Sequence, residues 1–292
     1  GDLGGDIFGF VMQYENVDFR EALKILAQKA GVQLPEYRPR DPKEQEEKEL
    51  FLRINDFAAR LYHCVLISEE RGKEAMKYLT DRGLTADTIK QWQIGFAPIE
   101  FHFLHHALLK KNIKEDPIVK SGVCVKGEKG DVYDRFRGRI AFPILDYYGK
   151  IVGFSARILP ELDDGKTGKY INSPETLIYQ KSKILFGLNF AKDVIRKENE
   201  AVIVEGQMDC VASHQAGVKN VIASSGTALT LEQLNSLKRL TVNLKFCFDA
   251  DQAGKAAMRR AVENVLGTDF SVKIIVLEGA KDPDELIKKD PE

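Results

Sequence analysis

The sequence has little cysteine, almost no net charge and no long hydrophobic run. Its four cysteines include no Cys-x-x-Cys pair, which argues against common zinc-binding and dithiol motifs. No stretch approaches the roughly 20 apolar residues of a membrane span, and the first residues lack the basic-then-apolar order of a signal peptide. We therefore expect a cytoplasmic protein that makes no membrane contact.

The charges of the chain are balanced. There are 43 Lys and Arg residues against 44 Asp and Glu residues, for a net charge of -1. This balance argues against nucleic-acid binding by the whole surface, so any site for a polyanion must be local. The length of 292 residues suggests roughly two domains, with cores that need no disulfide or metal.

The N-terminal part begins with a helical pattern and then becomes strongly charged. Asp18 and Glu21 have the spacing of a capping box, and Gly31 ends the short amphipathic helix that follows Asp18. Residues 38–49 are charged and interrupted by prolines, so we predict a linker there. From Leu50, apolar residues recur at intervals of three and four, which predicts a helix.

The remainder of the chain carries first a hairpin pattern and then an alternating one. Two β-rich runs, 139–145 and 151–159, flank a polar turn and predict an antiparallel hairpin. Beyond Glu200, short apolar strands alternate with helices, one of which starts with a capping box at Thr230 and Gln233. The predicted fold class is α/β: an α+β N-terminal subdomain followed by a parallel sheet with helices on both faces.

Acidic residues follow the strands of this predicted parallel sheet. Ligands bind at the carboxyl ends of such strands, so these acids should gather at one edge. The six acids are Glu205, Asp209, Asp249, Asp251, Asp282 and Asp284. Because like charges a few ångströms apart raise each other's pKa, the cluster needs a cation to stay ionised, and oxygen donors favour Mg²⁺ or Mn²⁺. We predict two or more such ions, with Glu205, Asp249 and Asp251 nearest the chemistry.

A locally basic region precedes the acids. Between residues 135 and 183, nine Lys and Arg residues face only five acids. Arg135, Arg137 and Arg139 alternate along a run that we expect to be extended, so all three should lie on one face and form a track for phosphates. Tyr170 and Asn172 can add a stacking surface and an amide beside this track.

The acidic motifs resemble the Toprim domain, which is shared by DnaG-type primases, topoisomerases and some nucleases. In chain order they are Glu205-Gly206-x-x-Asp209, Asp249-Ala250-Asp251-x-x-Gly254 and Asp282-Pro283-Asp284. Three upstream segments, 133–144, 153–157 and 169–175, resemble the RNA-polymerase core of the DnaG-type primases, and the resemblance covers nearly the whole chain. One departure is Gln207, where that family commonly has Tyr, and we expect it to affect packing more than chemistry.

The resemblance implies a DNA-directed RNA polymerase that makes short RNA primers on single-stranded DNA in the cytoplasm, within the bacterial replisome. It implies that Glu205 acts as a metal ligand or a general base, and it assigns nucleotide and template binding to Arg135, Arg137, Arg157, Lys169, Tyr170, Asn172 and Lys181. The implied partners are the template, ribonucleoside triphosphates, a replicative helicase held by a C-terminal domain absent here, and a guanosine alarmone as inhibitor. Zinc is expected only in the full-length protein, because its ligands would precede Gly1.

The implied organisation has four parts. These are the end of a zinc-binding domain at 1–34, a linker at 35–49, a basic α+β subdomain at 50–198, and the Toprim domain with the start of a helical part at 199–292.

Three alternatives to a primase differ in what they require of the sequence. A Toprim nuclease would use the same metals to add water, but it does not need the basic block in this form. A non-catalytic nucleic-acid-binding module would use a structural metal, whose loss should strongly lower thermal stability. A phosphatase with an Asp-x-Asp nucleophile would need a catalytic Lys and a Thr-rich strand end that we do not find.

Overall fold

The computed structural model describes residues 6–32, 41–225 and 229–289, which belong to two compact units, Gly1–Gln45 and Glu46–Glu292. In the first unit, α1 (Ile7–Tyr14) packs against α2 (Phe19–Lys29). The Asp18 carboxylate accepts a hydrogen bond from the Glu21 amide and caps α2, as the spacing predicted.

The long helix α3 (Pro42–Ser68) starts earlier than the sequence predicted. The predicted linker, 35–49, is helical from Pro42, so the linker prediction is wrong for this part, while 33–40 lie outside the described residues. The reason is that Glu, Lys and Gln are strong helix formers, and proline is well suited to the first position of a helix. The charged first part of α3 is therefore helical although it has no apolar face, and the helix continues into the part that has one.

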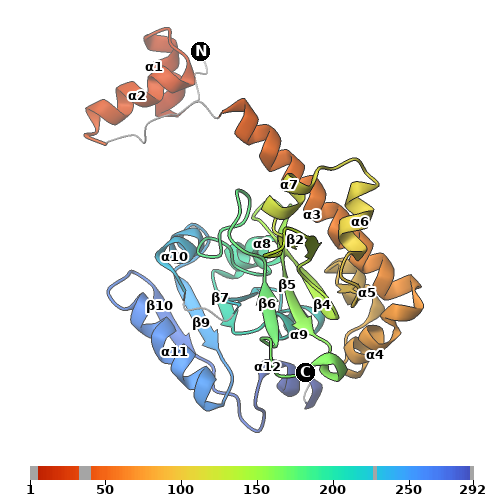
Figure 1. The fold of residues 1–292 in the computed structure, drawn as a ribbon. Coiled ribbons are helices and arrows are strands. Elements are labelled where there is room, and N and C mark those ends of the chain that lie inside the picture. The colour runs from red at the N-terminus through yellow and green to blue at the C-terminus, as the bar shows by residue number, and fades with distance from the viewer. Residues whose placement is uncertain (1–5, 33–40, 226–228, 290–292) are drawn as a thin grey trace. The chain divides into compact units, whose positions relative to one another are not determined.

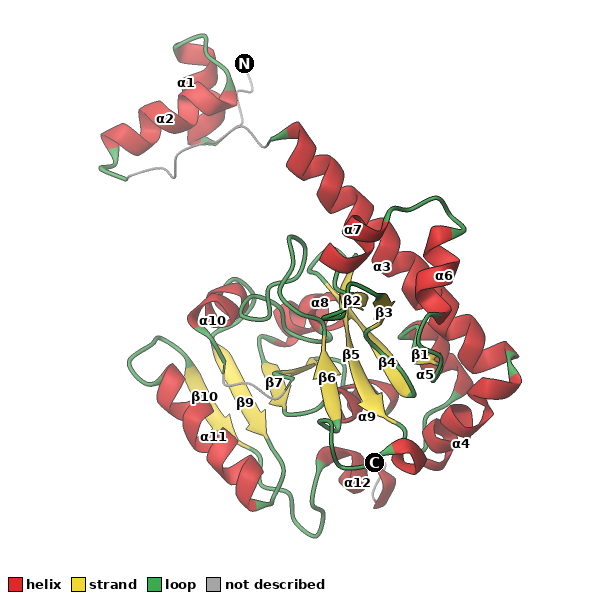
Figure 2. Ribbon diagram, viewed as in Figure 1, coloured by secondary structure: helices red, strands yellow, loops and turns green. Residues whose placement is uncertain are grey.

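The first part of the second unit is built on an antiparallel sheet of order β1-β4-β5-β6 (Figures 1 and 2). Its strands are β1 (Gly95–Ala97), β4 (Arg139–Leu145), β5 (Ile151–Ile158) and β6 (Tyr170–Asn172). The antiparallel pairing of β4 with β5 confirms the predicted hairpin. Both faces of the sheet are buried: Ile140 and Phe142 pack toward α4 and α5, whereas Phe154 packs with Tyr62 of α3.

Short elements complete this part. The helices are η1 (Glu70–Gly72), α4 (Lys73–Asp81), α5 (Ala86–Gln91), α6 (Phe103–Leu109), α7 (Glu115–Lys120) and η2 (Pro160–Leu162). A separate two-stranded sheet pairs β2 (Cys124–Lys126) with β3 (Val132–Asp134).

The second part is the predicted parallel sheet, in the order β10-β9-β7-β8. Its strands are β7 (Ala201–Val204), β8 (Val221–Ala223), β9 (Asn243–Cys247) and β10 (Ser271–Ile274). The helices are α8 (Leu188–Glu198), α9 (Gln207–Gln215), α10 (Leu231–Lys238), α11 (Gln252–Val265) and α12 (Pro283–Lys289). The predicted capping box at the start of α10 is present.

Helices cover both faces of the parallel sheet, as predicted. Alternate residues of β7 enter different cores: Val202 and Val204 pack with α9, whereas Ala201 and Ile203 pack with α8, α10 and α11. The core on the α9 side also contains residues of the antiparallel sheet, so the two sheets share one core and hold each other in place.

No helix within the described residues has the length and apolar character needed to cross a bilayer.

Candidate active site

A cavity of about 250 Å³ lies where the antiparallel sheet meets the carboxyl ends of the parallel strands. On the antiparallel side it is lined by Arg157 of β5, by Lys169, and by Tyr170 and Asn172 of β6. On the parallel side its lining acids are Glu205, Asp209, Asp249 and Asp282. The cavity therefore joins four of the predicted metal-binding residues to four of the predicted nucleotide- and template-binding residues.

The positions of the acids follow from the parallel topology. Glu205 directly follows β7, Asp209 lies in the first turn of α9, and Asp249 stands two residues beyond β9. A Cβ on Gly254 would lie 2.2 Å from the carbonyl oxygen of Asp249, so only glycine allows α11 to start this close to the acidic loop.

The acids destabilise one another's charged forms. Burial, followed by the charges of Asp249 and Asp282, raises the pKa of Asp209 to about 7. Burial and then Glu205 raise the pKa of Asp249 to about 6. Glu205 likewise has a raised pKa, caused first by burial and then by Asp251. At neutral pH, burial and mutual repulsion therefore destabilise the ionised form of these carboxyl groups.

Two oxygens of the cluster are suited to a cation. Glu205 Oε2 and Asp249 Oδ1 are buried and have no hydrogen-bond partner among the described residues. Unpartnered carboxylate oxygens in a repulsive cluster fit a hard divalent cation such as Mg²⁺ or Mn²⁺. As the described side chains stand, however, no three Asp, Glu, His or Cys residues form a group that could hold a metal ion.

Two of the predicted metal ligands do not line the cavity. Asp251 caps α11 by accepting from the Gly254 amide at 2.7 Å, and it acts on the cavity through its charge. Asp284 is 1% exposed and pairs with Arg82 Nη2 and Lys288 Nζ, both at 2.9 Å. The Asp284 backbone amide lowers the pKa of the Asp209 carboxylate, which opposes the effect of the neighbouring acids.

The basic side of the cavity is held by aromatic rings. The Arg157 guanidinium lies 5.0 Å from the ring centroid of Tyr78 and 5.6 Å from that of Tyr170. Burial, followed by the charges of Arg157 and Arg82, lowers the pKa of Lys169. The negative charge of Asp249 raises the pKa of Lys169, and the positive charge of Lys169 lowers the pKa of Asp249. This is consistent with acidic and basic groups that face each other across one cavity.

The predicted track of three arginines is wrong. Residues 135–138 form a turn between β3 and β4, with φ of +62° at Gly138, so side chains there do not alternate as in a strand. Arg135 Nε donates to the Gly122 carbonyl at 2.9 Å, and Arg137 stacks on Phe101 with its Cζ 4.5 Å from the ring centroid.

Arg139 instead belongs to the interior. It is 3% exposed, and its guanidinium donates to four acceptors: the carbonyls of Ala156, Gly168 and Lys169, and Thr167 Oγ1. None of Arg135, Arg137, Arg139 and Lys181 lines the cavity.

Sequence reasoning missed Arg82, which follows α4 and lines the cavity. Its only sequence signal was the Arg-Gly pair that separates two helices, which does not indicate a site. Gln207 is 4% exposed and lines the cavity. It therefore contacts the site directly, whereas the sequence predicted mainly a packing role.

Comparisons with known proteins agree with this geometry. A family model for the DNA primase catalytic core, N-terminal domain, matches residues 61–192, and a Toprim-like model matches 202–287. A DNA primase of Halalkalibacterium halodurans is 41% identical over 287 residues, which are 98% of this chain and 47% of that protein. The chain spans about half the length of the curated relatives that it matches.

Solved structures extend the match to three dimensions. The RNA polymerase domain of Mycobacterium tuberculosis primase DnaG is 36% identical, with a TM-score of 0.75 over 83% of this chain and 80% of that one. A DnaG primase catalytic domain bound to single-stranded DNA is 32% identical, with a TM-score of 0.72 over 84% of this chain and 79% of that one.

Proposed function

Because the chain belongs to the DnaG-type DNA primase family, we propose that it is the catalytic core of a primase. In this proposal it joins ribonucleotides into short RNA primers on a single-stranded DNA template, in the cytoplasm. The observation that carries the proposal is that one cavity has acids on one side and Arg157, Lys169 and Tyr170 on the other. The relative solved with single-stranded DNA supports a DNA template.

The acidic side would hold divalent cations. Glu205 and Asp249 offer unpartnered oxygens, and Asp209 and Asp282 line the same cavity. When bound, Mg²⁺ or Mn²⁺ would favour ionisation of an attacking 3′-hydroxyl and neutralise charge on the transferred and departing phosphates. Binding would require these side chains to rearrange, because the described ones do not form a complete metal site as they stand.

The basic side would bind and orient the nucleotide. Arg157 and Lys169 provide positive charge for the phosphates, and the rings of Tyr78 and Tyr170 both contact the Arg157 guanidinium. The buried Asn172 Oδ1 has no partner among the described residues and can accept a hydrogen bond from a ribose or a base. Arg82, held by Asp284, adds a fixed positive charge.

The remaining template-binding assignments stay predictions. Arg135, Arg137 and Lys181 lie outside the cavity, so we propose that they contact the template strand beyond the reacting nucleotides. A replicative helicase, and a guanosine alarmone that would compete with nucleotides at the basic side, remain expectations of the resemblance.

The test is RNA synthesis on single-stranded DNA with labelled ribonucleotides and Mg²⁺ or Mn²⁺. The chain should produce short template-dependent RNA, and Asp249→Asn should reduce it by on the order of a hundredfold. The matched control is Asp116→Asn, which removes a carboxyl that is 71% exposed on α7 and lies outside the cavity. Shortened template DNA would instead indicate a nuclease, and full synthesis by Asp249→Asn would refute the assignment of the acids.

A further inference from the structure

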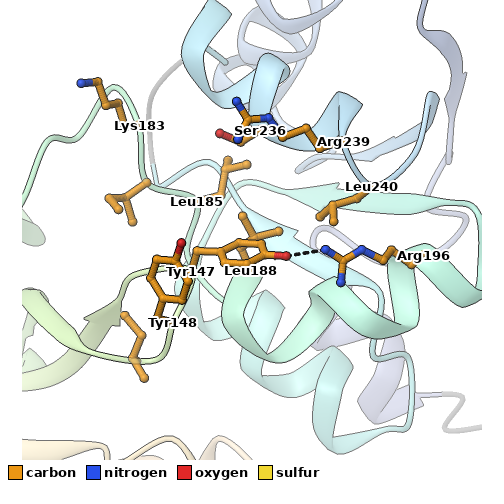
Figure 3. Close-up of a pocket in the computed structure, with 11 residues that line it drawn as sticks. Tyr147, Tyr148, Lys183, Leu185, Leu188, Arg196, Ser236, Arg239 and Leu240 are labelled. Atoms are coloured by element: carbon orange, nitrogen blue, oxygen red, sulfur yellow. Dashed lines mark hydrogen bonds between the residues drawn. The ribbon is translucent and has the colours of Figure 1, made fainter. Parts of the chain in front are cut away.

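A second cavity, of about 310 Å³, lies at the turn between β4 and β5 (Figure 3). Its apolar walls come from β4, from the segment that leads into α8, from α8 itself and from the segment that follows α10. These residues are Leu145, Ile184, Leu185, Leu188 and Leu240. Two tyrosines of the turn, three cationic side chains and Ser236 complete the lining, and no Asp or Glu contributes to it.

This cavity is distinct from the candidate active site. The two cavities share no lining residue. The turn meets β5 at Ile151, whereas Arg157 of the active site stands six residues further along the same strand, a span of about 20 Å. A ligand in one cavity would therefore leave the other open.

One wall of the second cavity is rigid. Tyr147 Oη is hydrogen-bonded to Arg196 Nη2 (Figure 3). The Tyr147 carbonyl also accepts from Lys192 Nζ at 2.8 Å. The Lys192 ammonium also lies 4.4 Å from the centroid of the Tyr147 ring. Arg196 is further paired with Asp193. These cations are therefore engaged in holding Tyr147 in place.

Three other lining side chains, those of Tyr148, Lys183 and Arg239, are available to a ligand. Tyr148 packs edge-on against Tyr147, with centroids 5.5 Å apart, yet is 82% exposed and presents a ring to solvent. Lys183 and Arg239 are exposed at the rim and form no ion pair with any residue that the structure describes. The cavity thus combines an apolar floor, an open aromatic ring and positive charge that no lining acid balances.

We propose that this cavity is a second nucleotide-binding site, in which a base packs against Tyr148 and the apolar floor while its phosphate binds Lys183 and Arg239. A flat apolar body joined to an anion matches this lining, because aromatic rings stack on bases and cations bind phosphates. The volume is at the small end of ligand pockets, so it suits a single nucleotide. The ligand is either a free nucleotide or one nucleotide of a strand. The proposal rests on this cavity alone and not on the proposed primase activity.

The first experiment measures binding of labelled oligothymidylate and, separately, of labelled ATP, by fluorescence anisotropy in EDTA. We expect Arg239→Gln to weaken binding about tenfold. For oligothymidylate, the variant should also reduce the magnitude of the negative slope of log K against log salt concentration by about 0.7, because one phosphate contact is lost. The matched control is Lys197→Gln, an exposed cation of α8 outside the cavity. Because Arg239 is exposed, the variant should fold, which circular dichroism checks.

The two ligands distinguish the two sources. Weakening with oligothymidylate indicates a nucleotide of a strand, and weakening with ATP indicates a free nucleotide; either supports the site. If Arg239→Gln binds both ligands as Lys197→Gln does, the proposal is overturned. It is also overturned if polyglutamate of equal charge displaces the ligand equally well, since the occupant would then be an acidic peptide.

A second experiment locates the bound base. Bromouracil-substituted single-stranded DNA is photo-crosslinked to the chain, and the modified peptide is identified by mass spectrometry. The site predicts a crosslink to the peptide that contains Tyr148, and Tyr148→Ala should remove it. Crosslinks confined to other peptides would overturn the strand form of the proposal, whatever the result of the primer-synthesis assay.

Discussion

Asp209→Asn should stabilise the metal-free protein at neutral and alkaline pH. Asp209 is 8% exposed, and its pKa is raised to about 7 by burial and then by neighbouring acids. An unfolded aspartate has a pKa of about 3.9. The folded state therefore binds the Asp209 proton more tightly than the unfolded state does.

The direction and size of the effect follow from linkage. The stability that comes from the protonated Asp209 carboxyl is fully present below about pH 4 and is lost as the pH rises through about 7. A shift of roughly three units corresponds to about 4 kcal/mol across that window. Asn removes the charge while keeping nearly the size of Asp and a side-chain oxygen that can accept a hydrogen bond. We expect Asp209→Asn to gain about 2–4 kcal/mol at pH 8 and almost nothing at pH 4.

The assay is urea unfolding in EDTA between pH 4 and pH 8, followed by the fluorescence of Trp92. This is the only tryptophan, it is 2% exposed, and it stacks on Phe186 with centroids 5.3 Å apart, so it reports on the core shared by the two sheets. Asp193→Asn controls for the loss of one surface carboxyl. If Asp209→Asn were no more stable than the parent at pH 8, or if its gain did not grow with pH, the account of the acidic cluster would be refuted.

Further predictions concern the packing and the two sides of the cavity. Arg139→Met should destabilise the chain by about 2–4 kcal/mol in urea unfolding, because it leaves buried carbonyls unpaired, and an unchanged midpoint would contradict the buried role of Arg139. Thr230→Ala should cost about 1–2 kcal/mol in the same assay, because the capping box of α10 is lost, and a neutral effect would show that the cap adds no stability. Mg²⁺ should raise the melting temperature more at pH 8 than at pH 5, and an equal rise at both would mean that it does not bind the cluster. Arg157→Ala should lower nucleotide incorporation about a hundredfold, whereas unchanged incorporation would remove Arg157 from the site.

The acidic side of the site was predictable because its geometry follows from topology. In a parallel sheet, each strand delivers its carboxyl end to the same edge, so the alternation of strands and helices was enough to expect the acids at one edge. The pairing of β7 with β9, which brings Glu205 close to Asp249, came from the structure and not from the sequence. The capping box of α10 was equally local, and the structure confirms it.

The parts that escaped prediction depend on local breaks or on distant packing. The alternation expected of Arg135, Arg137 and Arg139 required a continuous strand, but the turn at Gly138 interrupts it and sends Arg139 into the interior. Arg82 lines the cavity and pairs with Asp284, about 200 residues further along the chain, and no sequence pattern records such a long-range contact. The start of α3 was missed because charged residues have high helix propensity even without an apolar face.

The measurement that tests the account most directly is addition of a single ribonucleotide to an RNA primer annealed to single-stranded DNA, with Mg²⁺ or Mn²⁺. This reaction needs both sides of the cavity but no initiation step. We expect the chain to extend the primer, and Asp249→Asn and Arg157→Ala each to lose extension while keeping the parent's circular dichroism. Extension at the parent rate by either variant would contradict the claim that this cavity is the active site.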